Sequence, residues 1–372
     1  MKKYFLFINI FLLFGSLISL AQEISLRDAF KDKFLIGVAL NAGQVVSTDK
    51  NVRNLVDNQF SAVVAENCMK SMYLQPQEGH FDFKMADQLI EMAERNGQIV
   101  IGHCLVWHSQ LPSWFLKDND GKRVSKELLG ERIQNHIKTV MSRYKGKVKG
   151  WDVVNEAVEN DGQFRKSPFY EILGEDFLEI AFKAADEADP DAELYYNDYS
   201  MHLPAKRKKV VNMINDLKAK GCRIDAIGMQ SHMDYGVPLD EYEKSIEAFA
   251  ATGCKVMITE LDVSALPTPY GQQGAAVESL QEYQEKLNPF VNGMPEDAEA
   301  IFTDYYCNLF EIYLKHAKDI TRVNFWGLSD SESWKNNFPV RGRTDYPLAY
   351  DRQLKPKRFV AKIIQMALNG KW

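Results

Sequence analysis

Eight short apolar segments alternate with amphipathic helical segments along the chain, which predicts an α/β protein built as a single closed (β/α)8 barrel. Polar or aromatic residues follow nearly every apolar segment, as expected where all strand ends meet on the face that carries a barrel's active site. A doubly wound open sheet is the alternative, but no glycine-rich phosphate turn follows the first segment. Strands are predicted at residues 34–40, 60–65, 99–106, 148–154, 193–196, 226–229, 255–259 and 323–326.

The composition is that of an ordinary globular protein. The 372 residues are 45% hydrophobic and 26% charged, and the net charge is −6. One basic run, at residues 206–209, lies on a predicted helix and is interpreted as a solvated face, so no nucleic-acid partner is expected. A chain of this length forms two domains or one barrel, and because no linker interrupts it we expect one catalytic domain over residues 22–372.

The first 21 residues are predicted to be a secretory signal peptide. Two lysines precede an apolar run at residues 4–20, and a small-residue cleavage site, Ser-Leu-Ala, ends at Ala21. The alternative is an uncleaved membrane anchor, for which the run is barely long enough. We therefore expect an exported protein, periplasmic or extracellular, with no membrane insertion after cleavage. Its oligomeric state is open, and a monomer is assumed.

The predicted helices each have one apolar face. A short helix is expected at residues 26–33 and the last one at 356–368, and three others carry stripes at helical spacing. We interpret the aromatic residues in these stripes as core packing rather than a ligand surface. The stripes are Phe83, Ala86, Leu89, Ile90 and Ala93; Ile133, Ile137, Val140, Met141 and Tyr144; and Phe302, Tyr305, Tyr306, Leu309, Phe310 and Tyr313.

One connection, at residues 264–296, follows the seventh strand and is unusually long for a compact domain. A short helix is predicted within it, at residues 275–287. Because the connection comes directly after Glu260, we expect it to form part of the wall of the site.

The five cysteines are Cys68, Cys104, Cys222, Cys254 and Cys307. Their number is odd and their spacing matches no metal motif. We expect free buried thiols. The alternative is a bridge between Cys222 and Cys254, which each precede a predicted strand.

Two carboxylates at predicted strand ends carry the candidate chemistry. Glu156 ends the stretch WDVVNEA after the fourth strand, and Glu260 follows the seventh strand in KVMITELD. Three positions apart on a ring of eight strands places them nearly across the barrel mouth. Glycoside hydrolysis needs such a pair, one acid to protonate the leaving oxygen and one carboxylate to attack the anomeric carbon. The alternative is two ordinary surface loop acids.

Neighbouring residues indicate which acid has which role. His232 and Asp262 are placed to approach Glu260, and hydrogen bonds to a carboxylate favour its charged form, which suits a nucleophile. Asn155 precedes Glu156 and is an uncharged donor and acceptor suited to a sugar hydroxyl. Glu156 is then the general acid and later the base.

The other strand-end residues have the composition of a sugar-binding cleft. Tryptophans offer flat apolar faces for sugar rings, and polar side chains offer hydrogen bonds to hydroxyls, a combination typical of ligand sites. Taken singly, a tryptophan or a histidine is more often part of a core. The tryptophans are Trp107, Trp326 and Trp334, and the polar residues are Glu66, Asn67, Lys70, His103 and Gln230.

Seven motifs in order resemble those of the family-10 glycoside hydrolases, whose typical member is a secreted endo-1,4-β-xylanase. Each motif alone is weak, but together they cover nearly the whole chain after the signal segment at barrel-like spacing. They are AENCMK (65–70), GHCLVWHSQLPSW (102–114), WDVVNEA (151–157), YNDY (196–199), GMQSH (228–232), ITELDV (258–263) and FWGLSDSESW (325–334).

The resemblance implies a (β/α)8 barrel, retaining hydrolysis of xylan through a glycosyl-enzyme intermediate, and no metal or organic cofactor. By motif, Glu156 falls on the acid/base position and Glu260 on the nucleophile position. The chain departs from the family at Ser71, where many members have tryptophan, and at Cys104, where threonine is frequent. The residues on positions that hold the sugar on the non-reducing side of the cut are Glu66, Asn67, Lys70, His103, Trp107, Asn155, Gln230, His232, Trp326 and Trp334.

Three other readings stay open. The first is a barrel glycosidase for another β-linked glycan, such as cellulose or mixed-linkage glucan. The second is a catalytically silent glycan-binding protein, against which both carboxylates are present together with His232 and Asp262. The third is a metal-dependent hydrolase using His103 and His232, which no closely spaced ligand motif supports.

Overall fold

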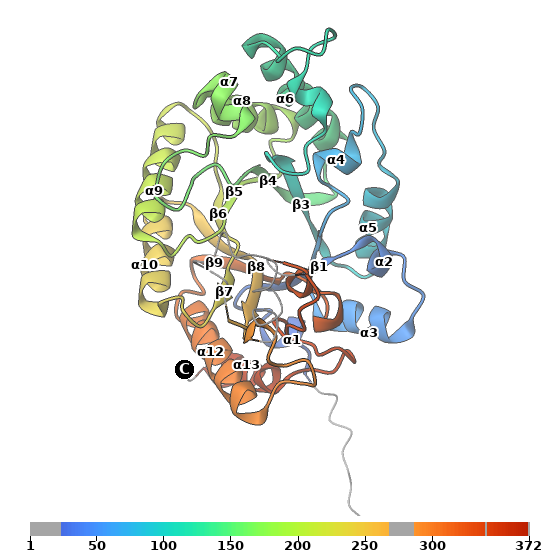
Figure 1. Cartoon of the computed structure of the whole chain (residues 1–372), viewed down its shortest axis with the longest axis vertical. Coiled ribbons are helices and arrows are strands. Elements are labelled where there is room, and N and C mark those ends of the chain that lie inside the picture. The colour runs from blue at the N-terminus through green and yellow to red at the C-terminus, as the bar shows by residue number, and fades with distance from the viewer. Residues whose placement is uncertain (1–23, 268–285, 339–340, 371–372) are drawn as a thin grey trace, which may run out of the picture.

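In the computed structural model of the protein, eight parallel strands form a closed ring (Figure 1). The structure describes residues 24–267, 286–338 and 341–370. Successive ring strands pair, β6 pairs with β8, and β9 returns to β1, so the predicted (β/α)8 barrel is confirmed. The ring strands are β1 (Leu35–Leu40), β2 (Ala62–Ala65), β3 (Ile99–Val106), β4 (Val148–Asn155), β5 (Glu193–Asp198), β6 (Ala226–Met229), β8 (Lys255–Ser264) and β9 (Ile320–Phe325).

All eight predicted strands overlap ring strands, but the region before and after Glu260 differs from the prediction. The seventh ring strand, β8, continues to Ser264 instead of ending at Thr259. An additional short strand, β7 (His232–Asp234), lies where the prediction placed a polar strand end. The two differences have one cause, because β7 pairs with the outer part of β8 and extends the sheet there.

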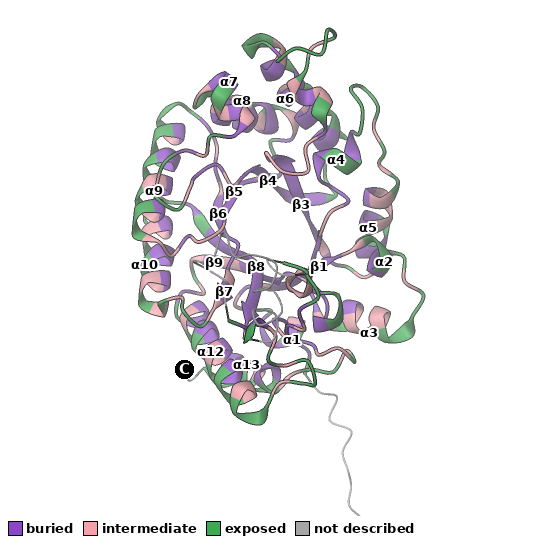
Figure 2. Cartoon of the chain, viewed as in Figure 1, coloured by how far each residue is buried: buried purple, intermediate pink, exposed green. Residues whose placement is uncertain are grey.

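Helices surround the ring and turn their buried faces toward it (Figure 2). The three predicted apolar stripes pack in the core, with Phe83 and Tyr305 half-buried at its edge. The predicted first helix is present as α1 but ends at Ala29 rather than Lys33, and the predicted last helix is present as α13. The helices are α1 (Leu26–Ala29), α2 (Ala42–Val45), α3 (Lys50–Gln59), α4 (Ser71–Leu74), α5 (Lys84–Arg95), α6 (Lys126–Arg143), α7 (Pro168–Leu173), α8 (Asp176–Ala188), α9 (Pro204–Ala219), α10 (Leu239–Ala250), α12 (Glu296–Lys315) and α13 (Arg358–Asn369), with short 3-10 turns at Ser113–Leu116, Asp330–Glu332 and Trp334–Asn336.

The barrel interior changes from apolar to polar toward the carboxyl ends of its strands. Ile101, Tyr195 and Met257 pack together inside the ring. Two residues further along two of these strands, on the same face, stand the buried polar side chains His103 and Asn197. This layering places hydrogen-bonding groups at the barrel mouth, the face formed by the carboxyl ends of the strands.

The ends of the long connection after β8 are attached to the segment that follows β9. The carbonyl of Pro267 accepts a bond of 3.1 Å from Arg343, and the side chain of Asn288 accepts one of 2.8 Å from the backbone of Thr344. Residues 275–285 of the predicted helix, and the predicted signal peptide at 1–21, lie outside the described residues.

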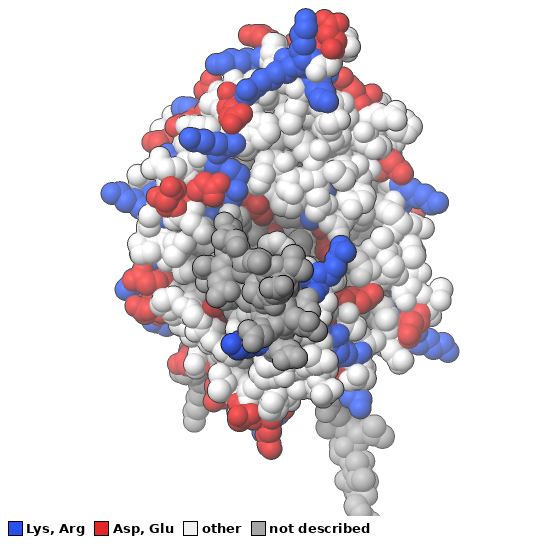
Figure 3. Space-filling view, in the orientation of Figure 1, with Lys and Arg blue, Asp and Glu red and all other residues white. Residues whose placement is uncertain are grey.

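The cysteines follow the prediction of free buried thiols in four cases, whereas Cys307 is only half-buried. All five thiols are free, so the alternative bridge between Cys222 and Cys254 does not form. Acidic and basic side chains are interspersed over the face seen in Figure 3. Within the described residues, no helix combines the length and apolar character needed to cross a membrane.

The close contact between β3 and β4 depends on a glycine. Trp151 on β4 is fully buried opposite Gly102 on β3. A Cβ at Gly102 would lie 2.0 Å from Cε3 of the indole, whereas a Cβ at Gly130 in α6 would meet Ile180 at an ordinary 3.6 Å.

We therefore expect Gly102→Ala to destabilise the fold by about 1–3 kcal/mol, because the enclosed indole would have to shift. Gly130→Ala is the control and should stabilise by up to about 1 kcal/mol through its helix propensity. Urea unfolding of the two variants measures both effects. Equal stability of the two would contradict the packing described for Trp151.

Candidate active site

Glu260 lies buried at the barrel mouth within a chain of hydrogen bonds. Its Oε1 accepts a bond of 2.8 Å from Nδ2 of Asn197, and its Oε2 lies 3.1 Å from Nε2 of His232. The other ring nitrogen of His232 lies 2.8 Å from Oδ2 of Asp262, which also accepts a bond of 2.8 Å from the indole of Trp334. One imidazole therefore connects two buried carboxylates, and Asp262 acts on Glu260 through it.

This arrangement holds Glu260 in its charged form. Burial alone would raise the pKa of Glu260, but the hydrogen bond from His232 and the nearby positive charges outweigh it and lower the pKa. The pKa of Asp262 is lowered in the same way, against burial, chiefly by His232 and Lys335. Burial would lower the pKa of His232, but the two carboxylates raise it to about 9. At neutral pH the site holds an imidazolium between two carboxylates.

Glu156 is held from both its backbone and its side chain. It follows β4 with φ of 59°, a left-handed conformation that costs a non-glycine residue roughly 1–2 kcal/mol. Its N–H donates to the carbonyl of Asn197 at 2.9 Å, and its own carbonyl accepts a bond of 2.9 Å from Arg165. Its carboxylate accepts bonds from the indole of Trp107 at 2.9 Å and the amide of Gln230 at 3.1 Å.

Amide side chains link the two acids. Oδ1 of Asn155 accepts bonds from Asn197 at 3.0 Å and from Gln230 at 3.2 Å. Since Asn197 also donates to Glu260 and Gln230 also donates to Glu156, the position of each carboxylate is tied to that of the other.

Asn197 was not among the predicted site residues, although it could have been found. It lies on β5, near the carboxyl end of the strand, where a barrel places its functional groups. Thr259 donates to its Oδ1 at 2.6 Å, which leaves its amide nitrogen for Asn155 and Glu260. The sequence shows the position of Asn197 but not these partners.

Rings of two tryptophans and two histidines pack together beside Glu260. Trp326 is buried, with its ring centre 5.2 Å from that of His103 and 6.3 Å from that of His232. The ring of Trp334 lies 4.8 Å from that of His232. His103 in turn lies 2.8 Å from the buried carboxylate of Asp152. In the predicted apolar wall, the tryptophan and histidine rings therefore hold one another in place through these contacts.

The predicted residues after β2 join the site beside Trp107. Lys70 donates to Oδ1 of Asn67 at 3.0 Å, and its ammonium lies 4.8 Å from the ring centre of Trp107. Glu66 is hydrogen-bonded to Asn67, and burial raises its pKa despite the nearby Lys70. The structure thus brings every predicted site residue to one mouth.

A buried ion pair supports the loop that carries Glu156. Lys206 is fully buried and contacts Asp198 at 2.7 Å, so the prediction that this part of the basic run is a solvated face is wrong. Asp198 also accepts bonds from the hydroxyl of Tyr196 at 2.5 Å and the backbone of Val158 at 3.3 Å. The tyrosine oxygen accepts the N–H of Ala157 at 3.2 Å. The backbone N–H groups of the two residues after Glu156 are therefore held by the Tyr196 hydroxyl and the Asp198 carboxylate.

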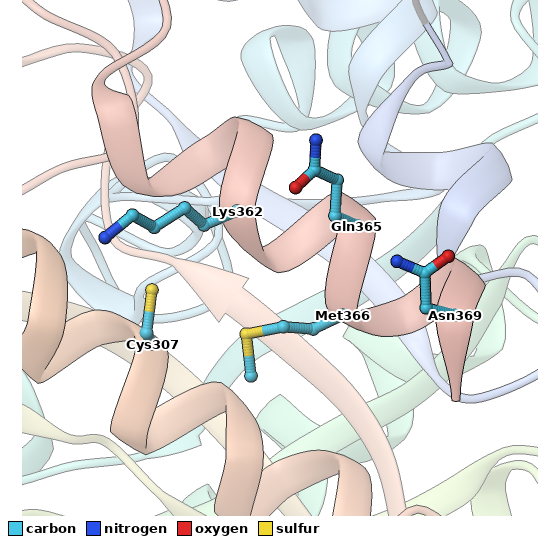
Figure 4. A pocket seen from close by; sticks show the side chains of 5 residues that line it. All are labelled: Cys307, Lys362, Gln365, Met366 and Asn369. Atoms are coloured by element: carbon cyan, nitrogen blue, oxygen red, sulfur yellow. The ribbon is translucent and has the colours of Figure 1, made fainter. Parts of the chain in front are cut away.

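Two other features lie on the outer helices, away from the mouth. Within the described ranges, the one group that could hold a metal ion is Glu243, Glu247 and His316, and Glu243 already pairs with His316 at 2.7 Å. A hollow of about 560 Å³ lies between α12 and α13 (Figure 4). It is lined by Cys307, Lys362, Gln365, Met366 and Asn369, none of which is a carboxylate.

A parallel barrel with two carboxylates and tryptophan walls at its carboxyl end is the architecture of a barrel glycosidase. The chain belongs to glycosyl hydrolase family 10, whose family model matches residues 25–366. The family expected from the motifs is thereby confirmed.

Similar proteins match most of the chain. It is 49% identical over 343 residues to an endo-1,4-beta-xylanase A of Xylanibacter ruminicola, covering 92% of this chain and 93% of that one. It is 37% identical over 345 residues to an endo-1,4-beta-xylanase of Geobacillus stearothermophilus, covering 92% and 98%. A solved endoxylanase of this family from a sugarcane soil metagenome matches with a TM-score of 0.87 and 40% identity, covering 92% of this chain and 99% of that chain.

The charge state of His232 gives a direct test of the hydrogen-bond chain. The imidazole of His232 should titrate with a midpoint of about pH 9 in the folded protein, as measured by NMR. Asp262→Asn should lower that midpoint, because it removes one of the two carboxylates that favour the charged ring. In the unfolded chain histidine titrates near ~6.5. The stability contributed by His232 is therefore fully present below about pH 6.5 and is lost as the pH rises through about 9. A midpoint near that of free histidine would contradict the ion-pair arrangement.

Proposed function

We propose that this protein is an exported endo-1,4-β-xylanase that cleaves internal β-1,4-xylosidic bonds of xylan with retention, using Glu260 as nucleophile and Glu156 as acid/base. The observation that carries the assignment is the ionised Glu260 held between Asn197 and His232, with Glu156 linked to it through amides. Relatives named as endo-1,4-beta-xylanases, at 49% and 37% identity, support the substrate class.

In the first step, Glu156 gives its proton to the glycosidic oxygen while Glu260 attacks the anomeric carbon. The carbon–oxygen bond of the leaving group breaks, the leaving sugar departs as an alcohol, and a covalent glycosyl ester forms on Glu260. In the second step, the Glu156 carboxylate takes a proton from water as the water oxygen attacks the same carbon. The ester bond breaks and Glu260 leaves as a carboxylate, so two inversions give net retention.

The hydrogen bonds around Glu260 suit both halves of this cycle. A lowered pKa keeps the carboxylate ionised and able to attack, and it makes the same carboxylate a good leaving group in the second step. The bonds from Asn197 and His232 fix its orientation, so little rotational freedom is lost on attack.

The remaining predicted residues are proposed to hold the sugar on the non-reducing side of the cut. Asn155 lies beside both acids and is placed for a hydroxyl next to the reacting carbon. Trp334 is half-buried and offers apolar ring surface near Glu260, whereas Trp326 packs against His232 with only 8% of its surface exposed. Lys70, Asn67 and Glu66 add polar groups beside Trp107. Polar groups placed on an apolar wall fix a ligand's orientation.

The signal segment at residues 1–21 is proposed to direct export, which suits an enzyme whose substrate is a polymer too large to enter a cell. No metal or organic cofactor takes part in the proposed steps. Glu156 carries out the proton transfers, and Glu260 forms and releases the bond to the sugar.

The two glutamates should fail differently when replaced. Glu260→Ala should abolish release of short xylo-oligosaccharides from xylan, because no ester can form. Glu156→Ala should slow the hydrolysis of xylan by roughly 10²–10⁴-fold. It should slow the glycosylation step of an aryl glycoside with an activated leaving group far less, because that group departs without a proton. Asp161→Ala, an exposed acid after the same strand, is the control and should retain activity.

These measurements also separate the alternatives. Full activity of Glu260→Ala would overturn the nucleophile assignment, and equal losses of Glu156→Ala on both leaving groups would count against the acid. Faster hydrolysis of cellulose or mixed-linkage glucan than of xylan by the unaltered enzyme would reassign the substrate.

A further inference from the structure

A second hollow, of about 410 Å³, opens beside the barrel mouth where β1 and β2 end. It lies between α2, α4 and α5, and its volume falls in the range of about 300–1,000 Å³ that small-molecule sites occupy. We call it the α2–α5 pocket. Its lining includes Asn41, Asn67, Cys68, Tyr73, Asp82 and Met85.

One residue of the pocket, Asn67, is linked to the proposed catalytic site by a chain of contacts. Asn67 lines the pocket and accepts the ammonium of Lys70, which lies over the ring of Trp107. The indole of Trp107 donates to Glu156. A sugar chain that passes the acids toward Asn67 therefore has this pocket ahead of it.

The lining has the chemistry of a carbohydrate site. Tyr73 is 48% exposed although it is a large aromatic residue, and it lines the hollow, so its ring is available for a sugar to stack on. Asn41 and Asn67 supply amides, and Asp82 supplies a carboxylate that can accept from two hydroxyls. Among the described residues that line the pocket, Asp82 is the only charged one, which disfavours an acidic sugar.

We propose that the α2–α5 pocket binds one further neutral pentose unit of the glycan on the non-reducing side of the cut, with Tyr73 stacked on its ring. This inference rests on the proposed function. The pentose is either the next unit of the xylan backbone or an arabinosyl branch. Both are neutral pentose rings that carry hydroxyl groups, and the choice of substrate distinguishes them.

The test compares Tyr73→Ala with Tyr73→Phe, which keeps the ring, and with Met72→Ala as a matched control. Met72 is the neighbouring residue of α4 and is similarly exposed, at 44%, but does not line the pocket. Each variant is assayed for kcat/KM on an aryl β-xylobioside, on xylohexaose, and on a xylo-oligosaccharide with an arabinosyl branch on the non-reducing side. Because both side chains are exposed, folding should be unaffected.

We expect Tyr73→Ala to lower kcat/KM about three- to tenfold on at least one of the two larger substrates, a loss typical of one aromatic stacking contact. The xylobioside should be unaffected, and Tyr73→Phe and Met72→Ala should stay within about twofold of the unaltered enzyme. A loss confined to xylohexaose assigns the pocket to the backbone, and a loss confined to the branched substrate assigns it to the branch.

The proposal is overturned if neither larger substrate is affected, if the xylobioside loses as much as they do, or if Met72→Ala has the same effect as Tyr73→Ala. Failure of the proposed function looks different, because the unaltered enzyme would then hydrolyse none of the three substrates.

Discussion

The site depends on keeping one buried carboxylate ionised at the mouth of a barrel. A charge removed from water is costly unless it is paired and hydrogen-bonded, and Glu260 has both kinds of partner in His232 and Asn197. His232 is itself held by Asp262, to which Trp334 donates. The additional strand β7 supports this series of hydrogen bonds, because its pairing places His232 opposite Asp262 on β8. The pairing of β7 with β8 therefore helps to keep the buried Glu260 carboxylate charged.

Among the residues that the structure describes, Glu156 has no ion-pair partner of its own, and its position is set by hydrogen bonds to its backbone and side chain. Glu156 occupies a left-handed conformation, and its N–H and carbonyl are bound by Asn197 and Arg165. The residues that follow are fixed by the buried pair of Asp198 and Lys206. Strained backbone persists where its surroundings over-determine it, and such places are often functional. The two glutamates therefore sit in unlike surroundings while sharing one cluster of amides, which suits two unlike roles.

The sequence predicted the barrel and both acids because these follow from local patterns, namely apolar runs with polar residues at their ends. It did not predict β7 or the full length of β8, because their pairing depends on register between distant segments. Lys206 looked like part of a solvated face because its partner, Asp198, lies on a different element and is buried with it. The conformation of Glu156 likewise arises from contacts to other strands and loops, which residue types alone do not show.

In the proposed mechanism, Glu260 forms a covalent bond to the sugar. An aryl 2-deoxy-2-fluoro-β-xylobioside tests it directly, because the fluorine slows both steps while the activated leaving group still allows the first, so the ester accumulates. Peptide mass spectrometry of the trapped enzyme should place one fluoro-xylobiosyl group on Glu260, with none on Glu156. A label on another residue, or turnover of the parent aryl β-xylobioside with inversion at the anomeric carbon, would contradict the account.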